Sequence, residues 1–344
     1  MTNKRTMSKI ISIDGSQGGG QILRSSLALS LITGQPFHIT KIRGQRPKPG
    51  LKRQHLTCVQ AALEVGRGSA DGAELNSQEL VFHPGQVRGG DYHIRISTAG
   101  STTLVLQTVL LPLLGANKDS SITIEGGTHN PMAPPVDFLQ DCYLPVLHEM
   151  GAKVILNLDR QGFAPAGGGQ ITARIKPSTL KPHTLLERGK LKSIWARVLS
   201  AHVESRVASR EAAALKKHLG SETDITIENI KDSAGPGNAV LIGSTWQEVS
   251  EVTIAHGERG RTSESVVRNA IKDFARYQNA IAPVGRRLAD QLLLPFALAG
   301  GGSFRTLPLT NHFETNRKVI EAFLPVEVRT TEESRSEVLV EIHS

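Results

Sequence analysis

The sequence is poor in cysteine, since Cys58 and Cys142 are the only two among 344 residues and form no CxxC pair. Neither a disulfide framework nor a zinc ribbon is therefore expected. A reducing compartment suits such a chain best, and we expect a cytoplasmic location. No apolar run approaches the roughly 18–20 residues that cross a bilayer. The polar start MTNKRTMSKI also lacks the apolar core of a signal peptide, so no membrane partner is expected.

Several catalytic signatures are absent as well. The sequence has no HExxH motif and no two histidines four residues apart, which leaves a metal hydrolase with little support. It contains neither the GxSxG nucleophile elbow nor a Walker A pattern, and neither cysteine has the context of a nucleophile. Most of the twelve histidines must therefore have structural roles.

Acidic residues are outnumbered, because 40 Lys and Arg face 32 Asp and Glu and give a formal net charge of +8. A basic excess favours polyanionic partners, nucleic acid above all. Six of the cations fall within residues 41–55, KIRGQRPKPGLKRQH, where prolines and glycines exclude an amphipathic helix before about Leu51. This stretch is either a solvated loop or an ordered phosphate-binding loop, since arginine pairs bidentately with phosphate oxygens.

Glycine, in contrast, is abundant and clustered. In ISIDGSQGGGQILRSSLALS, residues 11–30, a strand-like run leads into glycines and then a helical pattern with Leu23, Leu27 and Leu31. Backbone N–H groups at such a turn bind anions, although a glycine cluster is more often only a tight connection. Five clusters indicate repeated tight connections, a phosphate-lined site, or both. They are residues 18–20, 89–90, 126–127, 167–169 and 300–302.

A six-residue pattern recurs and indicates repeated structural units, because each copy has a polar residue five positions before a proline. The copies are QTVLLP at 107–112, QDCYLP at 140–145 and DQLLLP at 290–295. The strand-like runs that follow them are residues 121–127, 152–158 and 323–330. The opening stretch resembles a degenerate fourth copy, with Gly34 as helix C-cap. We therefore predict an α+β fold of repeated units, each a pair of helices on a small sheet.

The character of the chain changes between residues 186 and 281, where the glycine turns stop. This stretch has its own succession of elements, and the repeat pattern resumes afterwards at APVGRRLADQ. The expected elements are a strand over 190–203, a helix over 209–220, strands over 224–230 and 238–243, and a helix over 263–281. We predict a main domain of residues 1–185 and 282–344, with a smaller domain inserted at 186–281.

One histidine is distinguished by its position. His312 lies in LPLTNHFETNRKVIEAFLPV, next to Asn311, a candidate N-cap of a helix that ends near Phe323. The positive partial charge at a helix start lowers the pKa of an imidazole and favours its neutral form. A neutral imidazole could attack a phosphorus atom; alternatively, His312 is only a second capping group.

Eight segments carry a specific combination of motifs between about Ile10 and about Thr330. They are IDGSQGGGQILRSSLALSLITGQPF, IRGQRPKPGLKRQHL, GSTTLVLQTVLLP, GGTHNPMAPPVDF, APAGGG, GPGN, LADQLLLPFALAGGG and NHFETN with the later FLPV. Together they resemble the RNA 3′-terminal phosphate cyclase family. The resemblance implies units of two helices on a four-stranded sheet and an inserted domain of thioredoxin-like arrangement. It also implies ATP-dependent conversion of an RNA 3′-terminal phosphate to a 2′,3′-cyclic phosphate, through a covalent histidine–AMP and an RNA adenylate.

The resemblance also assigns roles to individual residues. It implies that His312 is the nucleophile, that Asp290 holds the nucleotide and that Pro134 packs against adenine. The other positions matched to ATP contacts are Gln107, Arg287, Leu288, Ala289 and Gln291. The positions matched to the RNA end or to nucleotide phosphates are Arg24, Arg43, Arg46, Gln54 and His55. A divalent metal, Mg or Mn with unassigned ligands, is expected with ATP. The expected partner is an RNA with a 3′-phosphate, and a homodimer is a further expectation.

Three departures from the family pattern concern this same site. The family's glycine loop reads like DGxQGEGGGQ, whereas DGSQGGGQ is two residues shorter and lacks the glutamate that contacts a metal near ATP in the family. Arg287 stands where an aromatic residue or histidine is expected, and its guanidinium plane could stack on adenine instead. Residues 163–165 read Phe-Ala-Pro in place of the usual Phe-Tyr-Pro.

Three functions follow as alternatives. An active cyclase that uses His312 explains the whole set of motifs. A cyclase-like RNA-binding protein without activity, in RNA processing or ribosome assembly, would explain the missing glutamate. An enolpyruvyl transferase uses similar repeats but leaves the motif around His312 unexplained.

Overall fold

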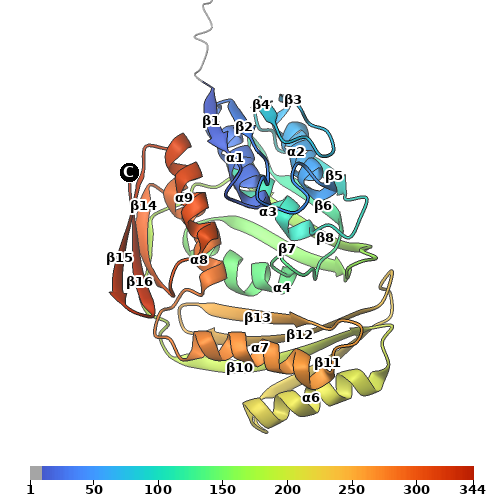
Figure 1. Ribbon diagram of the computed structural model, residues 1–344. Helices are drawn as coiled ribbons and strands as arrows, with labels where there is room; N and C mark the ends of the chain where they lie inside the picture. The colour runs from blue at the N-terminus through green and yellow to red at the C-terminus, as the bar shows by residue number, and fades with distance from the viewer. Residues whose placement is uncertain (1–9) are drawn as a thin grey trace, which may run out of the picture.

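The computed structural model describes residues 10–344, in which four four-stranded sheets are found (Figure 1). Three sheets belong to units that share one topology, and the fourth belongs to a segment within the third unit. Each unit runs strand, helix, strand, helix, strand, strand along the chain. The first two strands of a unit pair in parallel, and the fourth strand lies between the second and the third. The predicted α+β fold of repeated units is confirmed.

The first unit contains the glycine-rich connection and the basic stretch. Its elements are β1 (Ile11–Asp14), α1 (Gly20–Thr33), β2 (Phe37–Thr40), α2 (Arg53–Gly66), β3 (Ser69–Asp71) and β4 (Leu80–His83). The helix α1 ends as predicted, because Gly34 adopts the left-handed conformation with φ 70° and donates its N–H to the carbonyl of Ser30.

The second unit repeats this order with a modified second helix. Its elements are β5 (Asp91–Arg95), α3 (Thr102–Leu114), β6 (Ser120–Gly126), α4 (Val136–Phe138), η1 (Leu139–Tyr143), α5 (Leu144–Glu149), β7 (Lys153–Arg160) and β8 (Gly169–Lys176). The segment η1 is a π-helical turn just before Pro145, the proline in the first turn of α5. Since proline has no N–H to donate, the helical hydrogen-bond pattern is adjusted there.

The third unit closes the chain and holds His312. Its elements are β9 (His183–Leu185), α8 (Arg286–Leu298), β14 (Gly301–Thr306), α9 (Asn311–Phe323), β15 (Glu327–Ser334) and β16 (Glu337–His343). The strand predicted over 323–330 begins later, at Glu327, because α9 continues to Phe323.

The inserted segment lies between β9 and α8. Its elements are β10 (Leu191–Ala201), α6 (Ser205–Leu219), β11 (Asp224–Ile230), β12 (Gly237–Trp246), β13 (Ser250–His256) and α7 (Ser263–Gln278). The sheet order is β11-β10-β12-β13, with β10 and β11 parallel and the other pairs antiparallel. The five predicted elements are found in the predicted order, although α6 begins four residues before residue 209 and β13 was not predicted. Treating residues 186–281 as a separate domain remains our proposal.

The inserted sheet is buried on both faces, which follows from the alternation of side chains along its strands. Val198 and Ile242 belong to a core that the sheet shares with α6 and α7. Their neighbours Leu199 and Leu241 belong to the large core of the three units. In Figure 1, β12 and β13 accordingly lie between α4 on one side and α7 on the other.

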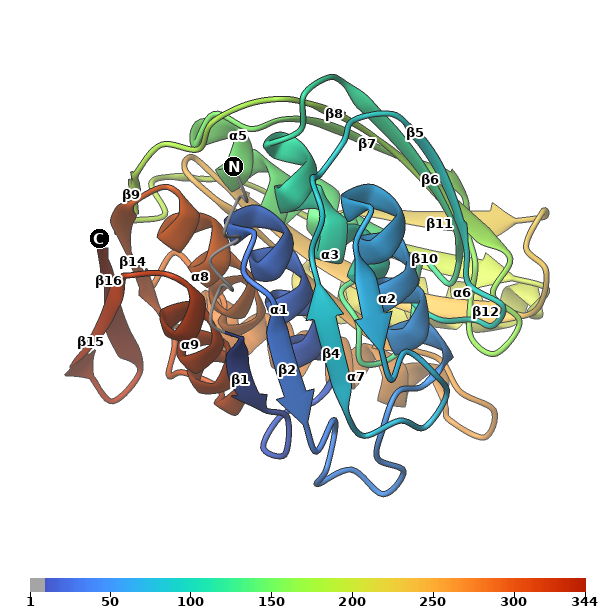
Figure 2. The same cartoon turned by 90° about the horizontal axis from the view of Figure 1, so that it is seen from above.

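The helices of the three units gather inside the molecule while the sheets lie around them, as Figure 2 shows. The first helices α1 and α3 pack against each other, and α9 packs on α1 and α8. Two copies of the six-residue repeat, in α3 and α8, occupy first helices. The copy QDCYLP lies instead in η1 and α5, the second helical segment of its unit, so it is not equivalent to the others. Among helices within residues 10–344, none combines the length and hydropathy that a membrane span requires.

Candidate functional site

The N-terminus of α9 is fixed by a threonine. The Thr310 hydroxyl accepts a hydrogen bond from the Phe313 backbone N–H (3.1 Å) and donates one to Asp290 Oδ1 (2.6 Å). Thr310 is therefore the N-cap, and the prediction of Asn311 was wrong by one residue because Asn311 already belongs to the helix. The Asn311 side chain instead donates to the backbone carbonyl of Gln17, at 3.5 Å. His312 follows as the second helical residue.

The glycine loop brings the N-terminus of α1 beside His312. The N-cap of α1 is Gly19, and no side chain caps this helix end. A Cβ atom added to Gly19 would lie 3.2 Å from Arg46 Nη2 and 3.9 Å from His312 Cε1. A Cβ on Gly20 would lie 2.9 Å from Arg24 Nη1 and still closer to His55 Nε2. The loop is therefore in contact with basic residues from three helices and from the basic stretch.

The basic stretch is an ordered loop, although residues 44–48 are exposed to solvent. Ile42 anchors it in the core at 1% exposure, and the Gly50 N–H donates to the Ile42 carbonyl at 2.8 Å. The Arg43 guanidinium donates to the carbonyls of Lys48 (2.8 Å) and Gly50 (3.0 Å), which shapes the loop from within. The loop is therefore ordered by its own hydrogen bonds, and phosphate binding by residues 41–55 stays a prediction.

His55 has a defined tautomer in its neutral form. Its Nδ1 accepts a hydrogen bond from the Lys52 backbone N–H at 3.2 Å, so the ring proton resides on Nε2, the atom near Gly20. Burial, followed by the charges of Arg24, Arg43 and Lys52, lowers the pKa of His55 to about 3. A neutral donor is thus held at the start of α1.

We call Arg24, Arg43, Arg46, His55 and His312 the cationic cluster. No carboxylate of the described chain forms an ion pair with any of these three arginines. Burial, and then Arg46, lowers the pKa of Arg43, and burial also lowers that of Arg24. Positive groups gathered without counter-charge, beside an uncapped helix N-terminus, favour a bound anion such as phosphate.

His312 is solvent-accessible at the edge of this cluster. Desolvation of the ring, followed by the charges of Arg24 and Arg46, lowers its pKa below the usual 6.5. The imidazole is therefore neutral at pH 7 and has a free lone pair, as a nucleophile needs.

The residues matched to ATP contacts fall into two groups. Gln107 and Gln291 meet across α3 and α8, since the Gln107 amide donates to Gln291 Oε1. Asp290 is mostly buried, and burial raises its pKa to about 6 despite the bond from Thr310. Leu288 and Ala289, in contrast, are 0% and 1% exposed in the core, so their side chains face no ligand.

The other two residues of this set lie nearer the surface. The Pro134 carbonyl accepts a hydrogen bond from the Thr103 hydroxyl at 2.8 Å, which ties it to the start of α3. Arg287 is exposed, with its guanidinium 3.6 Å from a carboxylate oxygen of Asp273 in α7. Gln54 also binds locally, because its Oε1 accepts from the Ser101 backbone N–H at 2.9 Å.

Sequence reasoning missed the residues that join the helices to one another. The Ser25 hydroxyl in α1 donates to Asn316 Oδ1 at 2.6 Å, and the Asn316 amide donates to the Asp290 carbonyl at 3.1 Å. Thr310 was also missed, although threonine is a preferred N-cap residue and this was the available signal. These contacts link the helices that hold the glycine loop, Asp290 and His312.

The predicted divalent metal finds no suitable protein ligands around the glycine loop. The side chains that lie closest to Gly19 and Gly20 are those of arginines and histidines, whereas Mg²⁺ prefers carboxylate oxygens. Across residues 10–344, no group of three or more His, Cys, Asp or Glu is arranged to hold a metal ion. Asp14, at the start of the loop, accepts a hydrogen bond from the Ser16 backbone N–H at 2.9 Å, and Asp290 accepts one from the Thr310 hydroxyl. The donor set does not fit a protein-held metal.

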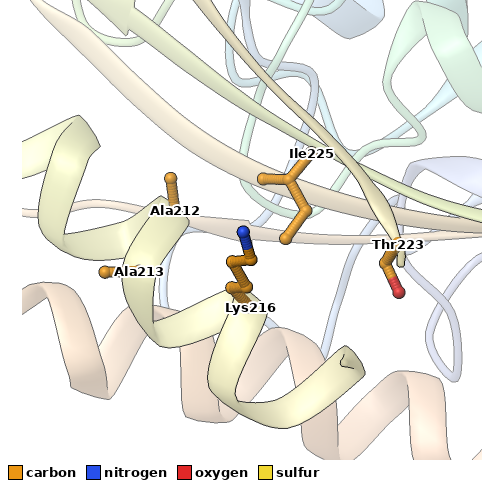
Figure 3. Close-up of a pocket in the computed structure, with 5 residues that line it drawn as sticks. All are labelled: Ala212, Ala213, Lys216, Thr223 and Ile225. Carbon is orange, nitrogen blue, oxygen red and sulfur yellow. The ribbon is translucent and has the colours of Figure 1, made fainter. Parts of the chain in front are cut away.

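A hollow elsewhere on the molecule offers no comparable chemistry. It lies between α6 and β11 of the inserted segment, lined by Ala212, Ala213, Lys216, Thr223 and Ile225 (Figure 3). Lys216 is the one charged group among these residues, and none of the candidate site residues reaches it.

An accessible neutral imidazole, set among arginines and an uncapped helix N-terminus, has the chemistry of a site that receives a phosphate group. A model of the RNA 3′-terminal phosphate cyclase family matches residues 16–330. The chain belongs to this family, and the prediction of an enzyme of this kind is confirmed.

Curated relatives agree with the family match. A protein of Pseudomonas fluorescens is 47% identical over 336 residues, covering 97% of this chain and 98% of its own length. A protein of Koribacter versatilis is 49% identical, and the match covers 94% of this chain and 92% of that protein. A protein of Ralstonia nicotianae is 45% identical, and the match covers 98% of this chain and 99% of that protein. Each is named RNA 3′-terminal phosphate cyclase.

Solved structures of enolpyruvyl transferases match only weakly. The enolpyruvyl transferase NikO from Streptomyces tendae is 10% identical with a TM-score of 0.37, and the match covers 97% of this chain and 48% of that one. The EPSP synthase from Acinetobacter baumannii is 10% identical with a TM-score of 0.33, and the match covers 98% of this chain and 65% of that one. Scores this low carry no argument for a transferase function.

Proposed function

We propose that this protein is an ATP-dependent RNA 3′-terminal phosphate cyclase in which His312 is the nucleophile. The observation that carries the proposal is the position of His312, a neutral and accessible imidazole beside Gly19 and Arg46. The names of the relatives support the reaction, and the uncompensated cationic cluster supports a polyanionic substrate.

In the first step, the lone pair of the His312 imidazole attacks the α-phosphorus of ATP. A nitrogen–phosphorus bond forms, the bond from the α-phosphorus to the bridging oxygen breaks, and pyrophosphate leaves. Negative charge that develops on the phosphoryl oxygens is stabilised by the Arg46 guanidinium and by the free N–H groups at the start of α1.

In the second step, an oxygen of the RNA 3′-phosphate attacks the adenylate phosphorus and the bond to His312 breaks. The neighbouring 2′-oxygen then loses its proton and attacks the 3′-phosphorus, and AMP leaves. Adenylylation is needed because an unactivated phosphate monoester has no good leaving group for this displacement. The last step is intramolecular, and its need for a 2′-hydroxyl selects RNA over DNA.

The remaining residues are assigned by their places around this chemistry. We assign Arg24, Arg43, Arg46 and His55 to phosphate groups, because they form the cationic cluster. We assign Gln107, Asp290 and Gln291 to the nucleotide, with Pro134 and the Arg287 guanidinium at the adenine. No step is routed through a metal ion, since the donor set does not fit one.

A single observation favours a second candidate, an RNA-binding protein of the same fold without catalysis. The glycine loop lacks the carboxylate expected from the family pattern, and no group of three or more His, Cys, Asp or Glu among residues 10–344 is arranged to hold a metal ion. Such a protein would use the cationic cluster to bind RNA but would form no covalent adenylate.

The two candidates are separated by a cyclisation assay. An RNA oligonucleotide with a labelled 3′-phosphate is incubated with protein, ATP and a divalent cation, and resistance of the label to phosphatase is measured. We expect resistance with the native protein and with His218→Ala, a histidine variant at the end of α6, and none with His312→Ala. Tight RNA binding without phosphatase resistance would instead support the non-catalytic candidate.

A further inference from the structure

A cavity lies beside the N-terminus of α2 and includes Gln54, the residue whose side chain binds Ser101. It has a volume of about 430 Å³ and is lined by residues 52–54, Leu75, Asn76, Thr98 and Gly100. The lining comes from three segments: the start of α2, the loop before β4 and the connection that precedes α3.

The cavity is positively charged. Lys52 and Arg53 both line it, no acidic residue lies in the first turn of α2, and none lies among the lining residues. Lys52 Nζ donates to Asn76 Oδ1 at 2.7 Å, and within the described chain neither cation forms an ion pair. An anion would therefore meet two cations without competing carboxylates.

The walls of the cavity are held in place by the backbone. Asn76 adopts a left-handed conformation with φ 67°, and its N–H donates to the Leu51 carbonyl at 2.8 Å. Gln54 Oε1 accepts a hydrogen bond from the Ser101 N–H, so the start of α2 is joined to the N-cap residue of α3. Leu75, 43% exposed, adds an apolar surface that a ribose or base can contact.

The repeated topology relates this cavity to the surroundings of His312. Gln54 is the second residue of α2, and His312 is the second residue of α9, the equivalent helix of the third unit. Each side chain meets the connection that precedes a first helix: Gln54 binds Ser101 before α3, and His312 lies at Gly19 before α1. The cavity is thus the topological counterpart of the surroundings of His312, with Gln54 in the place of His312.

The two sites are also contiguous. His55 follows Gln54 directly in α2. Gln54 lines the cavity, whereas His55 directs its Nε2 toward Gly20 and belongs to the cationic cluster. The charge of Lys52 acts on His55 as well. A strand whose terminal phosphate lies at the cationic cluster therefore has a charged pocket next to it.

We propose that this cavity binds the nucleotide immediately 5′ of the RNA terminus, with Lys52 and Arg53 contacting the phosphodiester that joins it to the terminal nucleoside. The inference rests on the proposed function, which sets the terminal phosphate at the cationic cluster. The β- and γ-phosphates of ATP are the other source of the same chemistry. Gln107, Asp290 and Gln291, which we assign to the nucleotide, lie within α3 and α8, whereas the cavity is lined by the start of α2 and by residues before β4 and α3.

The test compares two substrates, adenosine 3′-monophosphate and the dinucleotide ApAp with a 3′-phosphate. The native protein is expected to cyclise the dinucleotide with a higher kcat/KM. In Lys52→Gln/Arg53→Gln this preference is expected to fall about tenfold, with the mononucleotide rate and self-adenylylation changed less than about twofold. Arg53→Gln alone, which keeps the Lys52–Asn76 bond, is expected to lose about threefold. The matched control is Lys216→Gln/Lys217→Gln on α6.

Each other outcome overturns the proposal. Equal loss with both substrates would assign the two cations to the terminal phosphate, and loss of self-adenylylation would assign them to ATP. An unchanged preference would leave the cavity without a role in binding. If the native protein forms no cyclic product, the proposed function fails separately. In that case, binding of a fluorescent hexanucleotide with a 3′-phosphate tests the cavity. Equal affinity of the native protein and the double variant would overturn the proposed RNA-binding role of the cavity.

Discussion

At the scale of single residues, the reactivity of His312 depends on its neighbours. Its pKa is lowered first by desolvation and then by Arg24 and Arg46, so the neutral form persists below pH 6.5. Adenylylation requires that neutral form, and its rate should therefore fall only as the pH drops through this lowered pKa.

The variant Arg46→Gln tests this dependence. Removing one positive charge raises the pKa of His312, so the acid limb of the rate of self-adenylylation should move to higher pH. The pH–rate profile and an NMR titration of the His312 ring are both measured. Arg261→Gln, an exposed substitution in the inserted segment, should leave both curves in place. An unshifted titration in Arg46→Gln would contradict the electrostatic account.

Thr310 is expected to position the nucleophile, because its hydroxyl caps α9 and binds Asp290. Thr310→Val keeps the shape but removes both bonds, and it should lower the free energy of unfolding by about 1 kcal/mol. It should also slow self-adenylylation at saturating ATP by about tenfold, whereas Thr310→Ser should restore most of the rate. If the valine and serine variants react equally fast, the hydroxyl has no role beyond folding.

At the scale of elements, the glycine loop is the least usual part of the site. It presents the uncapped start of α1 to the cationic cluster, yet no acidic residue lies between Gln17 and Gln21. Inserting Gly-Glu after Gln17 restores the length and charge of the family pattern. We expect this variant to be stimulated more strongly by Mg²⁺ or Mn²⁺ in self-adenylylation than the native protein.

The measurement is a titration with each cation after treatment with a chelator. A Gly-Gln insertion is the matched control, because it restores the length without the carboxylate. If both insertions respond to the cation as the native protein does, the missing glutamate does not determine the metal dependence.

Sequence patterns within a few residues predicted helices and strands well where the structure depends only on neighbouring residues. The leucine spacing of α1 and the C-cap Gly34 are properties of one turn of chain, and both are found. The cap of α9 was displaced by one residue because threonine and asparagine are both good caps. Which one caps was decided by Asp290, a residue 20 positions away that binds Thr310.

The site itself was predictable only in part, for the same reason. The motif resemblance selected residues that the fold does bring together, among them Arg46, His55 and His312 around the glycine loop. It could not show that Leu288 and Ala289 face the core or that Ser25 binds Asn316, 291 residues away. Contacts between helices of different units leave no local pattern in the sequence.

At the scale of the whole molecule, Arg188 joins the two segments that connect the inserted sheet to the third unit. Its guanidinium donates to the carbonyls of Ala282 (2.8 Å) and Tyr277 (2.6 Å) and lies 3.8 Å from the centre of the Tyr277 ring. The side chain is 6% exposed, so these bonds are made away from water.

Arg188→Met should leave the Ala282 carbonyl without a donor, remove a second bond to the Tyr277 carbonyl, and lower the free energy of unfolding by about 3 kcal/mol. Urea denaturation measures this change. Arg206→Met, which removes an exposed arginine from α6, should change it by less than about 0.5 kcal/mol. Equal effects of the two substitutions would show that the Arg188 contacts do not stabilise the connection.

The central claim is that His312 forms the covalent adenylate. The most direct measurement is to incubate the protein with ATP labelled at the α-phosphate, digest it, and map the label by mass spectrometry. The account predicts acid-labile label on the peptide that contains His312, and none in His312→Ala. Label on another residue, or label that persists in His312→Ala, would contradict it.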